Sequence, residues 1–155
     1  MGLRLTRAAD YAVRAMLHVG SLPEGVVALK DEIAQAQHIP PSFMAKILRQ
    51  LVKSGVLKSA RGVNGGFGLA RPAAEINLLD IVEGIEGPIH LTECAPDPEH
   101  CALSHDCPVS TVWLEVQRRM TGLLRETTLE MLLSAPRKNR HVVYSIGASH
   151  RPRAS

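Results

Sequence analysis

The sequence predicts a mainly α-helical protein with one short β-hairpin. Three observations support this fold class. Apolar residues recur at helical spacing in several segments, prolines and glycines separate those segments, and two short β-prone runs flank the glycine-rich stretch RGVNGG. With 155 residues, 45% hydrophobic composition and a mean hydropathy close to zero, the chain has the composition of a soluble globular protein with one core.

The first helix is expected over about residues 6–22, and Pro23 and Gly25 end it. Its apolar face consists of small and medium side chains at helical spacing, namely Ala8, Ala12, Ala15, Met16 and Val19. A shorter helix is expected in ALKDEIAQAQ, after which HIPPS breaks the chain. Pro41 suits the start of a third helix, because its missing N–H would have no intrahelical partner there.

The third helix has two different faces. Its predicted buried face consists of Met44, Ile47, Leu48 and Leu51, and the positions that face outward or flank this face include Ser42, Phe43, Lys46 and Arg49. Two helices joined by a tight turn, the second presenting such side chains, are typical of a helix-turn-helix whose recognition helix reads the DNA major groove. A three-helix core with no DNA ligand would show the same pattern.

Two β-prone runs, VLKSA and FGLAR, enclose RGVNGG and predict a hairpin, or wing. Asn64, Gly65 and Gly66 are expected to supply the positive φ angles of its turn. Arg61 lies at the entry of the turn and suits a narrow minor groove, although a solubilising role is the alternative. Helix, turn, helix and basic wing in this order predict a winged helix-turn-helix DNA-binding domain over residues 1–72.

Charge is strongly segregated along the chain. Residues 1–72 contain ten basic and four acidic residues, residues 73–135 contain three basic and eleven acidic, and residues 136–155 contain five basic and none acidic. The basic head suggests a polyanion such as double-stranded DNA as the partner, and a solvated basic surface is the alternative. The basic segment 135–155 shows no sustained period and is expected to be a flexible tail.

Beyond the wing, Asn77 is a predicted N-cap for a linking helix within residues 73–90, which Gly87 and Pro88 end. A long helix is expected over residues 109–134, with a heptad seam of Val109, Trp113, Val116, Met120, Leu123 and Thr127. A helix of about 37 Å exceeds what so small a domain covers, so it predicts dimerisation helices in a homodimer. The alternative is a helix that packs back along its own head.

The segment ECAPDPEHCALSHDC holds all three cysteines, Cys94, Cys101 and Cys107, within a loop expected over residues 91–108. The N-terminal sequence lacks a signal-peptide core and no segment could span a membrane, so the protein is expected in the cytoplasm with reduced thiols and no membrane partner. The spacing C-x6-C-x5-C favours an iron–sulfur cluster. Zinc held with His100 or His105, or three unligated thiols acting as a redox switch, are the alternatives.

The sequence resembles the IscR/NsrR-type bacterial transcription regulators, which are dimeric winged-helix proteins with an iron–sulfur cluster. The resemblance covers residues 1 to about 133, and it is carried by LTRAADYAVRAM, by EIAQAQHIPPSFMAKILRQLVKSGVLKSARGVNGGF and by the three-cysteine loop. It implies operator contacts by Ser42, Phe43, Lys46 and Arg61. It also implies that Cys94, Cys101 and Cys107 hold the cluster, and that cluster gain, loss or damage changes DNA affinity.

The resemblance further implies a fourth ligand. IscR-like members have a histidine three residues after the third cysteine, where this chain has Ser110, and NsrR-like members use an aspartate at the position of Asp10. These matches favour a 4Fe–4S cluster with Asp10 contributed by the partner subunit, in a repressor that senses nitric oxide. A 2Fe–2S cluster with His100 or His105 is the alternative. Without the resemblance, the local sequence favours another role for Asp10, which is to offset the helix dipole in the first turn and to pair with Arg14.

Other classes of function fit less well. Regulators of the same family that sense iron, cluster supply or redox state are alternatives to nitric oxide sensing. An electron carrier would not require the winged head or the charge segregation. An enzyme is not expected, because a surface loop offers His105 and Cys107 no water-excluding pocket.

Overall fold

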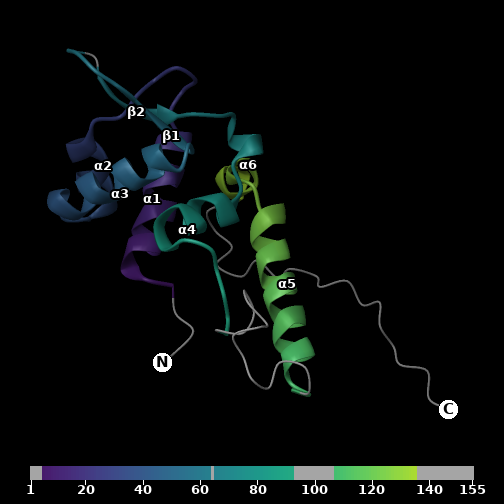
Figure 1. The fold of residues 1–155 in the computed structure, drawn as a ribbon. Coiled ribbons are helices and arrows are strands. Elements are labelled where there is room, and N and C mark those ends of the chain that lie inside the picture. Colours follow the sequence, from purple (N-terminus) through teal and green to yellow (C-terminus); the bar gives the residue numbers. More distant parts are fainter. Residues whose placement is uncertain (1–4, 64, 93–106, 136–155) are drawn as a thin grey trace.

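The computed structural model describes residues 5–63, 65–92 and 107–135, and Figure 1 shows how their elements are arranged. The helices are α1 (Arg7–Gly20), α2 (Lys30–Gln37), α3 (Pro41–Lys53), the short 3-10 helix η1 (Ala73–Glu75), α4 (Leu78–Glu86), α5 (Ser110–Glu126) and α6 (Leu129–Ser134). Strands β1 (Leu57–Ala60) and β2 (Gly66–Leu69) form an antiparallel hairpin. The predicted mainly α-helical winged helix-turn-helix fold is confirmed.

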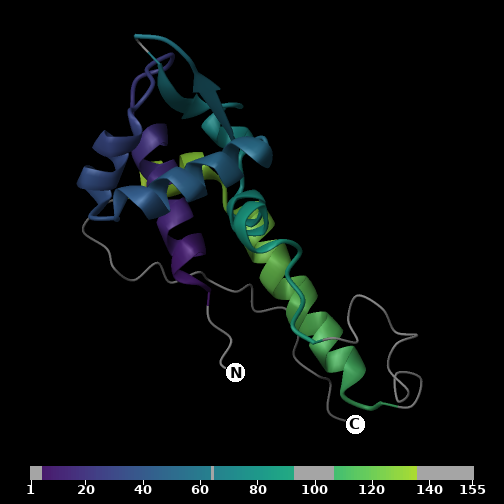
Figure 2. The same cartoon turned by 60° about the vertical axis from the view of Figure 1, so that its left-hand side comes forward.

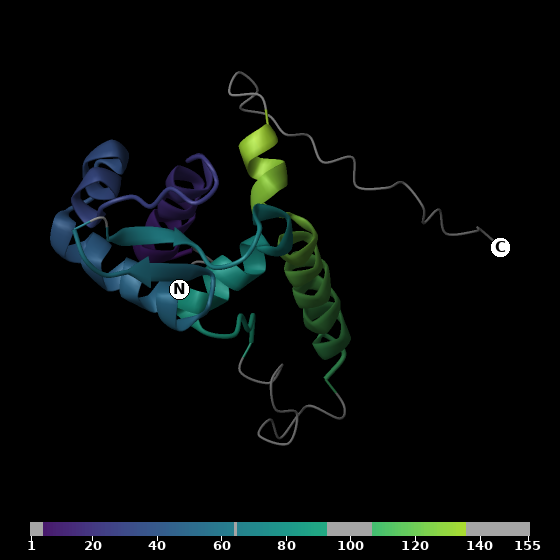
Figure 3. The same cartoon turned by 90° about the horizontal axis from the view of Figure 1, so that it is seen from above.

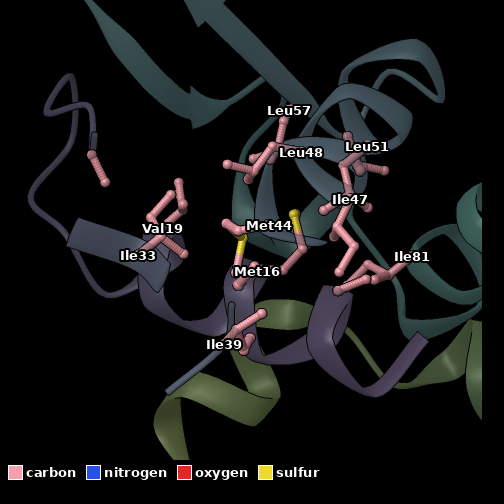
Figure 4. Packing of buried hydrophobic residues seen from close by; sticks show 14 of the residues in the cluster. Met16, Val19, Ile33, Ile39, Met44, Ile47, Leu48, Leu51, Leu57 and Ile81 are labelled. Atoms are coloured by element: carbon pink, nitrogen blue, oxygen red, sulfur yellow. The ribbon is translucent and has the colours of Figure 1, made fainter. Parts of the chain in front are cut away.

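The core lies where α1, α2, α3 and α4 meet. Met16 of α1, Ile33 of α2, Met44 and Leu48 of α3, and Ile81 of α4 are fully buried in one cluster (Figure 4). The apolar face predicted for the third helix is confirmed, because Met44, Ile47, Leu48 and Leu51 are all buried. A fully buried side chain of this size stabilises the fold by roughly 1.5–3 kcal/mol relative to an exposed one. Because this face is buried, the opposite face of α3 points toward solvent.

Local signals set the ends of the first three helices. The Thr6 hydroxyl accepts a hydrogen bond from the Ala9 N–H and caps α1. The turn between α2 and α3 begins at His38, which has a φ of 53° in the left-handed region. Ile39 in the same turn is buried, and Pro41 is at the first position of α3. The turn therefore holds α2 and α3 against one core.

The wing is a four-pair ladder that runs from Leu57↔Leu69 to Ala60↔Gly66. Ala28 adds an isolated bridge to Phe67, with both N–H···O distances at 2.9 Å. The prediction for its turn is partly wrong. Gly66 has a positive φ of 159°, as predicted, but Gly65 does not, and Gly62 has the other positive φ of the turn, at 107°. Gly65 is required for space, because a Cβ there would lie 2.6 Å from the Ala60 carbonyl oxygen. Asn64 lies outside the described residues.

The expected single helix over residues 109–134 is wrong, because the chain is extended between α5 and α6. The Thr127 carbonyl accepts a hydrogen bond from the Leu78 N–H, and the Leu129 N–H donates to the Ile76 carbonyl, each at 2.8 Å. Asn77 and Thr128 face each other across this bridge, and each caps the helix that follows it. Pairing with residues 76–78 therefore replaces the helical hydrogen bonds at the junction.

The helix α6 turns back onto the head. Leu129 is buried, and atoms of Leu129 and Leu133 come within 3.1 Å of the position that a Cβ would take at Gly20 of α1. By contrast, α5 has no buried residue and extends away from the body formed by α1 to α4 (Figure 2). Seen from above, α4 lies between the head and α5 (Figure 3). Among the described helices, none is long and apolar enough to cross a membrane.

Candidate DNA-binding surface and cysteine site

The outer face of α3 presents the predicted recognition side chains. Ser42, Phe43, Lys46 and Arg49 are all exposed, and Phe43 has 54% of its surface in solvent. Within the described part of the chain, Lys46 has no ion-pair partner, and the Arg49 guanidinium donates only to the Ala45 carbonyl at 3.1 Å. Cations without carboxylate partners are available to phosphates and base edges.

The wing extends this surface. Arg61 is exposed at the end of β1, as predicted. Sequence reasoning missed two neighbours, Lys58 on β1 and Val63 at the tip, and both are exposed. The signal for the lysine was that Lys58 is the one charged residue of the β-prone run VLKSA. Among these seven residues of α3 and the wing, four are cationic and none is acidic.

Cys107 lies three residues before the first residue of α5 and is the one cysteine within the described residues. Its thiol is free and partly exposed. The Ser110 hydroxyl donates to the Cys107 carbonyl oxygen at 2.8 Å, and the Ser110 N–H reaches the same oxygen at 3.2 Å. Ser110 thus closes the turn that starts α5.

The other predicted ligands of this loop, Cys94, Cys101, His100 and His105, lie outside the described residues. Hydrogen bonds fix the chain that leads into the loop. The Ile89 N–H donates to the Glu83 carboxylate at 3.2 Å, and the Leu91 N–H donates to the Gln117 side chain of α5 at 3.1 Å. The segment after α4 is therefore docked along α5.

Asp10 lies in the first turn of α1, and 63% of its side-chain surface is exposed. Its carboxylate is 3.6 Å from the Arg14 guanidinium, so the i, i+4 pair expected from the sequence is present. Arg14 also donates to the Gln37 carbonyl at the end of α2 and lies over the Tyr11 ring. Because an exposed ion pair of this length is weak, it does not prevent the Asp10 carboxylate from binding another cationic group.

The start of α1 is tied to the end of α4. The Thr6 N–H and hydroxyl both donate to the Glu86 carboxylate. Glu86 is the last residue of α4, and the chain continues from it toward the cysteine segment. The N-terminal ends of α1 and α5 point toward the same side of the molecule, opposite the wing (Figures 1 and 2). The N-terminal end of α5, which follows Cys107, is therefore remote from the wing (Figures 1 and 2). Asp10 is closer to the helix-turn-helix, because its pair partner Arg14 donates to the Gln37 carbonyl at the end of α2.

An apolar stripe on α5 has no cover within the described chain. Val109, Val112, Trp113, Val116 and Leu123 are each 42–54% exposed. The charged face of α5 contains Glu115, whose pKa is lowered to about 2 by hydrogen bonds from Arg118 and Arg119. Such an amphipathic helix, apolar on one side and ionised on another, is suited to pack on a partner helix.

A surface groove of about 450 Å³ lies between α1, β2 and η1, and none of its lining residues is a cysteine, histidine or serine. The groove is lined by residues 19–20, 22–27, 58 and 68–73, and neither Cys107 nor any residue of α5 is among them. The groove therefore contains neither a Ser–His nor a Cys–His pair.

Comparison with known proteins gives a consistent result. Residues 5–135 match the Rrf2 family model, which is described as iron-dependent transcriptional regulator. A candidate HTH-type transcriptional regulator of Mycobacterium tuberculosis is 35% identical over 127 residues, which cover 82% of this chain and 79% of the relative. The structure is similar to CymR, the global cysteine regulator of B. subtilis (TM-score 0.72, 25% identity, 86% and 98% coverage), and to T. potens IscR (0.68, 26%, 86% and 88%).

These matches agree with the DNA-reading geometry of α3 and the wing. The family and the M. tuberculosis relative are described as transcriptional regulators, which are not enzymes. Winged-helix regulators of this family bind DNA and are typically dimeric. Because the family model covers nearly the whole described chain and the fold matches IscR, the resemblance seen in the sequence is confirmed: this chain is a member of the Rrf2 family of winged-helix transcriptional regulators.

Proposed function

We propose that this regulator is a homodimeric repressor whose affinity for operator DNA is controlled by an iron–sulfur cluster, and that nitric oxide is the signal. The observation that carries the proposal is the position of the cysteines. All three lie in the segment that joins α4, which is packed into the DNA-reading head, to α5, which presents an uncovered apolar stripe. A change in this segment acts on both the head and the dimer helix.

The DNA contacts follow from the exposed side chains. Ser42, Phe43, Lys46 and Arg49 of α3 enter the major groove, and Arg61 of the wing reaches the adjacent minor groove. Two such heads, held by a pair of α5 helices, read two half-sites about 34 Å apart on one face of the duplex. Dimer geometry therefore decides whether both heads can bind at once.

The ligand set fits a cluster by its chemistry. Three thiolates, from Cys94, Cys101 and Cys107, suit iron–sulfur coordination, and the Cys107 thiol is free. The exposed carboxylate of Asp10 from the partner subunit completes the set for a 4Fe–4S cluster. When bound, the cluster supplies an iron site with a weak, exchangeable ligand at which a small molecule reacts.

A second candidate is a zinc- or thiol-based winged-helix repressor, or a member that senses iron, cluster supply or redox state. One of the similar solved structures is that of a global cysteine regulator with 25% identity to this chain, which favours keeping the thiol-based candidate. The zinc version would use the three cysteines with His100 or His105. A 2Fe–2S cluster with one of these histidines is the remaining variant of the cluster proposal.

Anaerobic purification separates these candidates. We expect brown protein with iron and sulfide in a fixed ratio, which shifts a DNA fragment selected by the protein from a random pool, and whose absorbance bleaches with stoichiometric nitric oxide. Colourless protein with bound zinc, or colourless metal-free protein that still binds the fragment, would support the second candidate. Brown protein without DNA binding would indicate an electron carrier and contradict the proposal.

A further inference from the structure

The chain that enters the cysteine segment and the chain that leaves it both lie far from the wing (Figures 1 and 2). The wing is at one end of the molecule, and the N-terminal end of α5 and the segment after α4 are at the other (Figures 1 and 2). Helix α4 lies between the head and α5 and packs on α1, α3 and α5 (Figure 3). Any effect of the cysteine segment on DNA binding must therefore pass through packed helices, and α4 is the one that leads directly into that segment.

One contact on this route is unusually close. An ideal Cβ at Gly84, in the last turn of α4, would lie 2.7 Å from the Ser54 Oγ and 2.9 Å from the Ser54 Cβ. Ser54 is the C-cap of α3, and its hydroxyl donates to the Leu51 carbonyl at 3.1 Å. The hydroxyl could rotate away from an added methyl group, but the Ser54 Cβ is fixed by the backbone. Only glycine lets α4 approach α3 this closely.

The presence of glycine at this position has no local explanation. Glycine is among the poorest helix formers, and the backbone of Gly84 has no left-handed φ that would favour it. Its neighbours in α4 are strongly held, with Ile81 and Val82 buried in the head and Glu86 bound to Thr6. The close crossing with Ser54 explains the choice of residue.

We propose that Gly84 and Ser54 form the positioning contact through which α4 sets the orientation of the recognition helix α3. A shift of α4 moves the C-terminal end of α3 and tilts its outer face relative to the wing. The transmission of a signal rests on the proposed cluster function, whereas the effect of the contact on DNA affinity does not.

The test uses the full-length dimer and the selected DNA fragment. Gly84→Ala should weaken DNA binding at least tenfold by pushing α4 off α3. Ser54→Gly removes the Cβ that a methyl group would meet, so Gly84→Ala combined with Ser54→Gly should bind within threefold of wild type. The matched control is Gly122→Ala in α5, where a Cβ meets nothing within 4 Å and binding should be unchanged.

Two outcomes overturn the contact: Gly84→Ala binds like wild type, or the double variant is as weak as Gly84→Ala. If circular dichroism shows that Gly84→Ala is unfolded, the double variant becomes the test of the contact. The double variant should be folded and should bind DNA, and an unfolded double variant would contradict the contact.

The transmission of a signal is tested with Ser54→Gly. This variant should reduce the ratio of dissociation constants of the cluster-loaded and cluster-stripped forms at least threefold. If this ratio is the same in Ser54→Gly as in wild type, the contact does not transmit the state of the cluster. If the ratio is one in the wild-type protein, the proposed function is wrong, but the comparison of DNA affinity between Gly84→Ala and the double variant still tests the contact.

Discussion

Substitutions of two cations on the predicted DNA-binding surface, Lys46 and Arg61, should have different effects on DNA binding. Lys46 is a flexible point charge on α3, whereas Arg61 is a planar donor on the wing. Lys46→Ala should weaken binding to all sequences and reduce the salt slope by about one. Arg61→Ala should cost roughly 1–3 kcal/mol and relax sequence preference, because it removes groove recognition.

Gel shifts at two salt concentrations on selected and scrambled fragments measure both effects. Arg125→Ala is the control for net charge, because Arg125 is exposed in the last turn of α5, away from α3 and the wing. If affinity and salt slope are the same for both variants as for wild type, Lys46 and Arg61 are not in the interface.

Asp10 is the predicted ligand whose carboxylate already has another partner, Arg14 of the same helix. Asp10→Ala should shorten cluster lifetime and change the rate of reaction with nitric oxide, while His100→Ala and His105→Ala leave both unchanged. The fold should persist, because an exposed i, i+4 pair such as Asp10 with Arg14 contributes only about 0.3–0.5 kcal/mol. Anaerobic absorbance decay and stopped-flow traces give the two rates.

The control for Asp10→Ala is Asp31→Ala, which removes an exposed acid from the first turn of α2. A cluster altered by a histidine variant and not by Asp10→Ala would show that the ligand assignment is wrong. At this scale the sequence predicted the Asp10–Arg14 pair, because both residues are on one turn. It did not predict the bond from Arg14 to the Gln37 carbonyl, which depends on how α1 packs against α2.

Among the elements, α5 carries the clearest unsatisfied surface. Its exposed apolar stripe predicts that Val116→Glu converts the dimer to monomers, because two buried carboxylates would face each other across the seam. The monomer should stay folded, since no residue of α5 is buried within its own chain. Operator affinity should fall at least tenfold, because binding then relies on a single half-site. Light scattering and circular dichroism measure assembly and fold.

Thr111→Glu is the matched control, because Thr111 is exposed on the same face of α5 as Glu115 and Arg118, away from the apolar stripe. This variant should remain dimeric. A Val116→Glu protein that is still a dimer would show that another surface joins the subunits.

The elements with strong local signals were predictable. The N-terminal proline of α3, the Asn77 cap of α4 and the apolar face of α3 appear as expected. The face of α1 is confirmed except at its start, where Ala9 is buried and the predicted Ala8 is only partly buried. The break between α5 and α6 was missed, although Thr128 with Glu130 two residues later is a plausible helix start. The apolar period continues across the break, and the backbone pairing that stabilises it involves residues about 50 positions earlier, which no local pattern reveals.

On the scale of the whole molecule, α4 and α5 form a hairpin that is closed at both ends. The Asn77–Thr128 bridge closes it beside the head, and the cysteine segment joins the far ends. The buried residues Ile76 and Leu129 flank the bridge, so it moves with the core. The hairpin therefore links the position of α5, and so of the partner subunit, to the head.

The sequence predicts the thiol ligands because cysteine chemistry is recognisable from residue type and spacing. It predicts neither which groups of two subunits meet at the cluster nor how closely α4 crosses α3, because both depend on packing between distant segments. The contact of Gly84 with Ser54 is an example, since a glycine within a helical pattern has several readings until its neighbour is known.

The most direct test of cluster-controlled DNA binding measures the operator dissociation constant of one anaerobic preparation before and after the cluster is removed by a chelator. We expect the two constants to differ at least tenfold, equivalent to about 1.4 kcal/mol of coupling. Cys101→Ala should be colourless and should match the stripped wild-type protein with or without the chelator. Equal constants for the loaded and stripped wild-type protein would contradict control by a cluster.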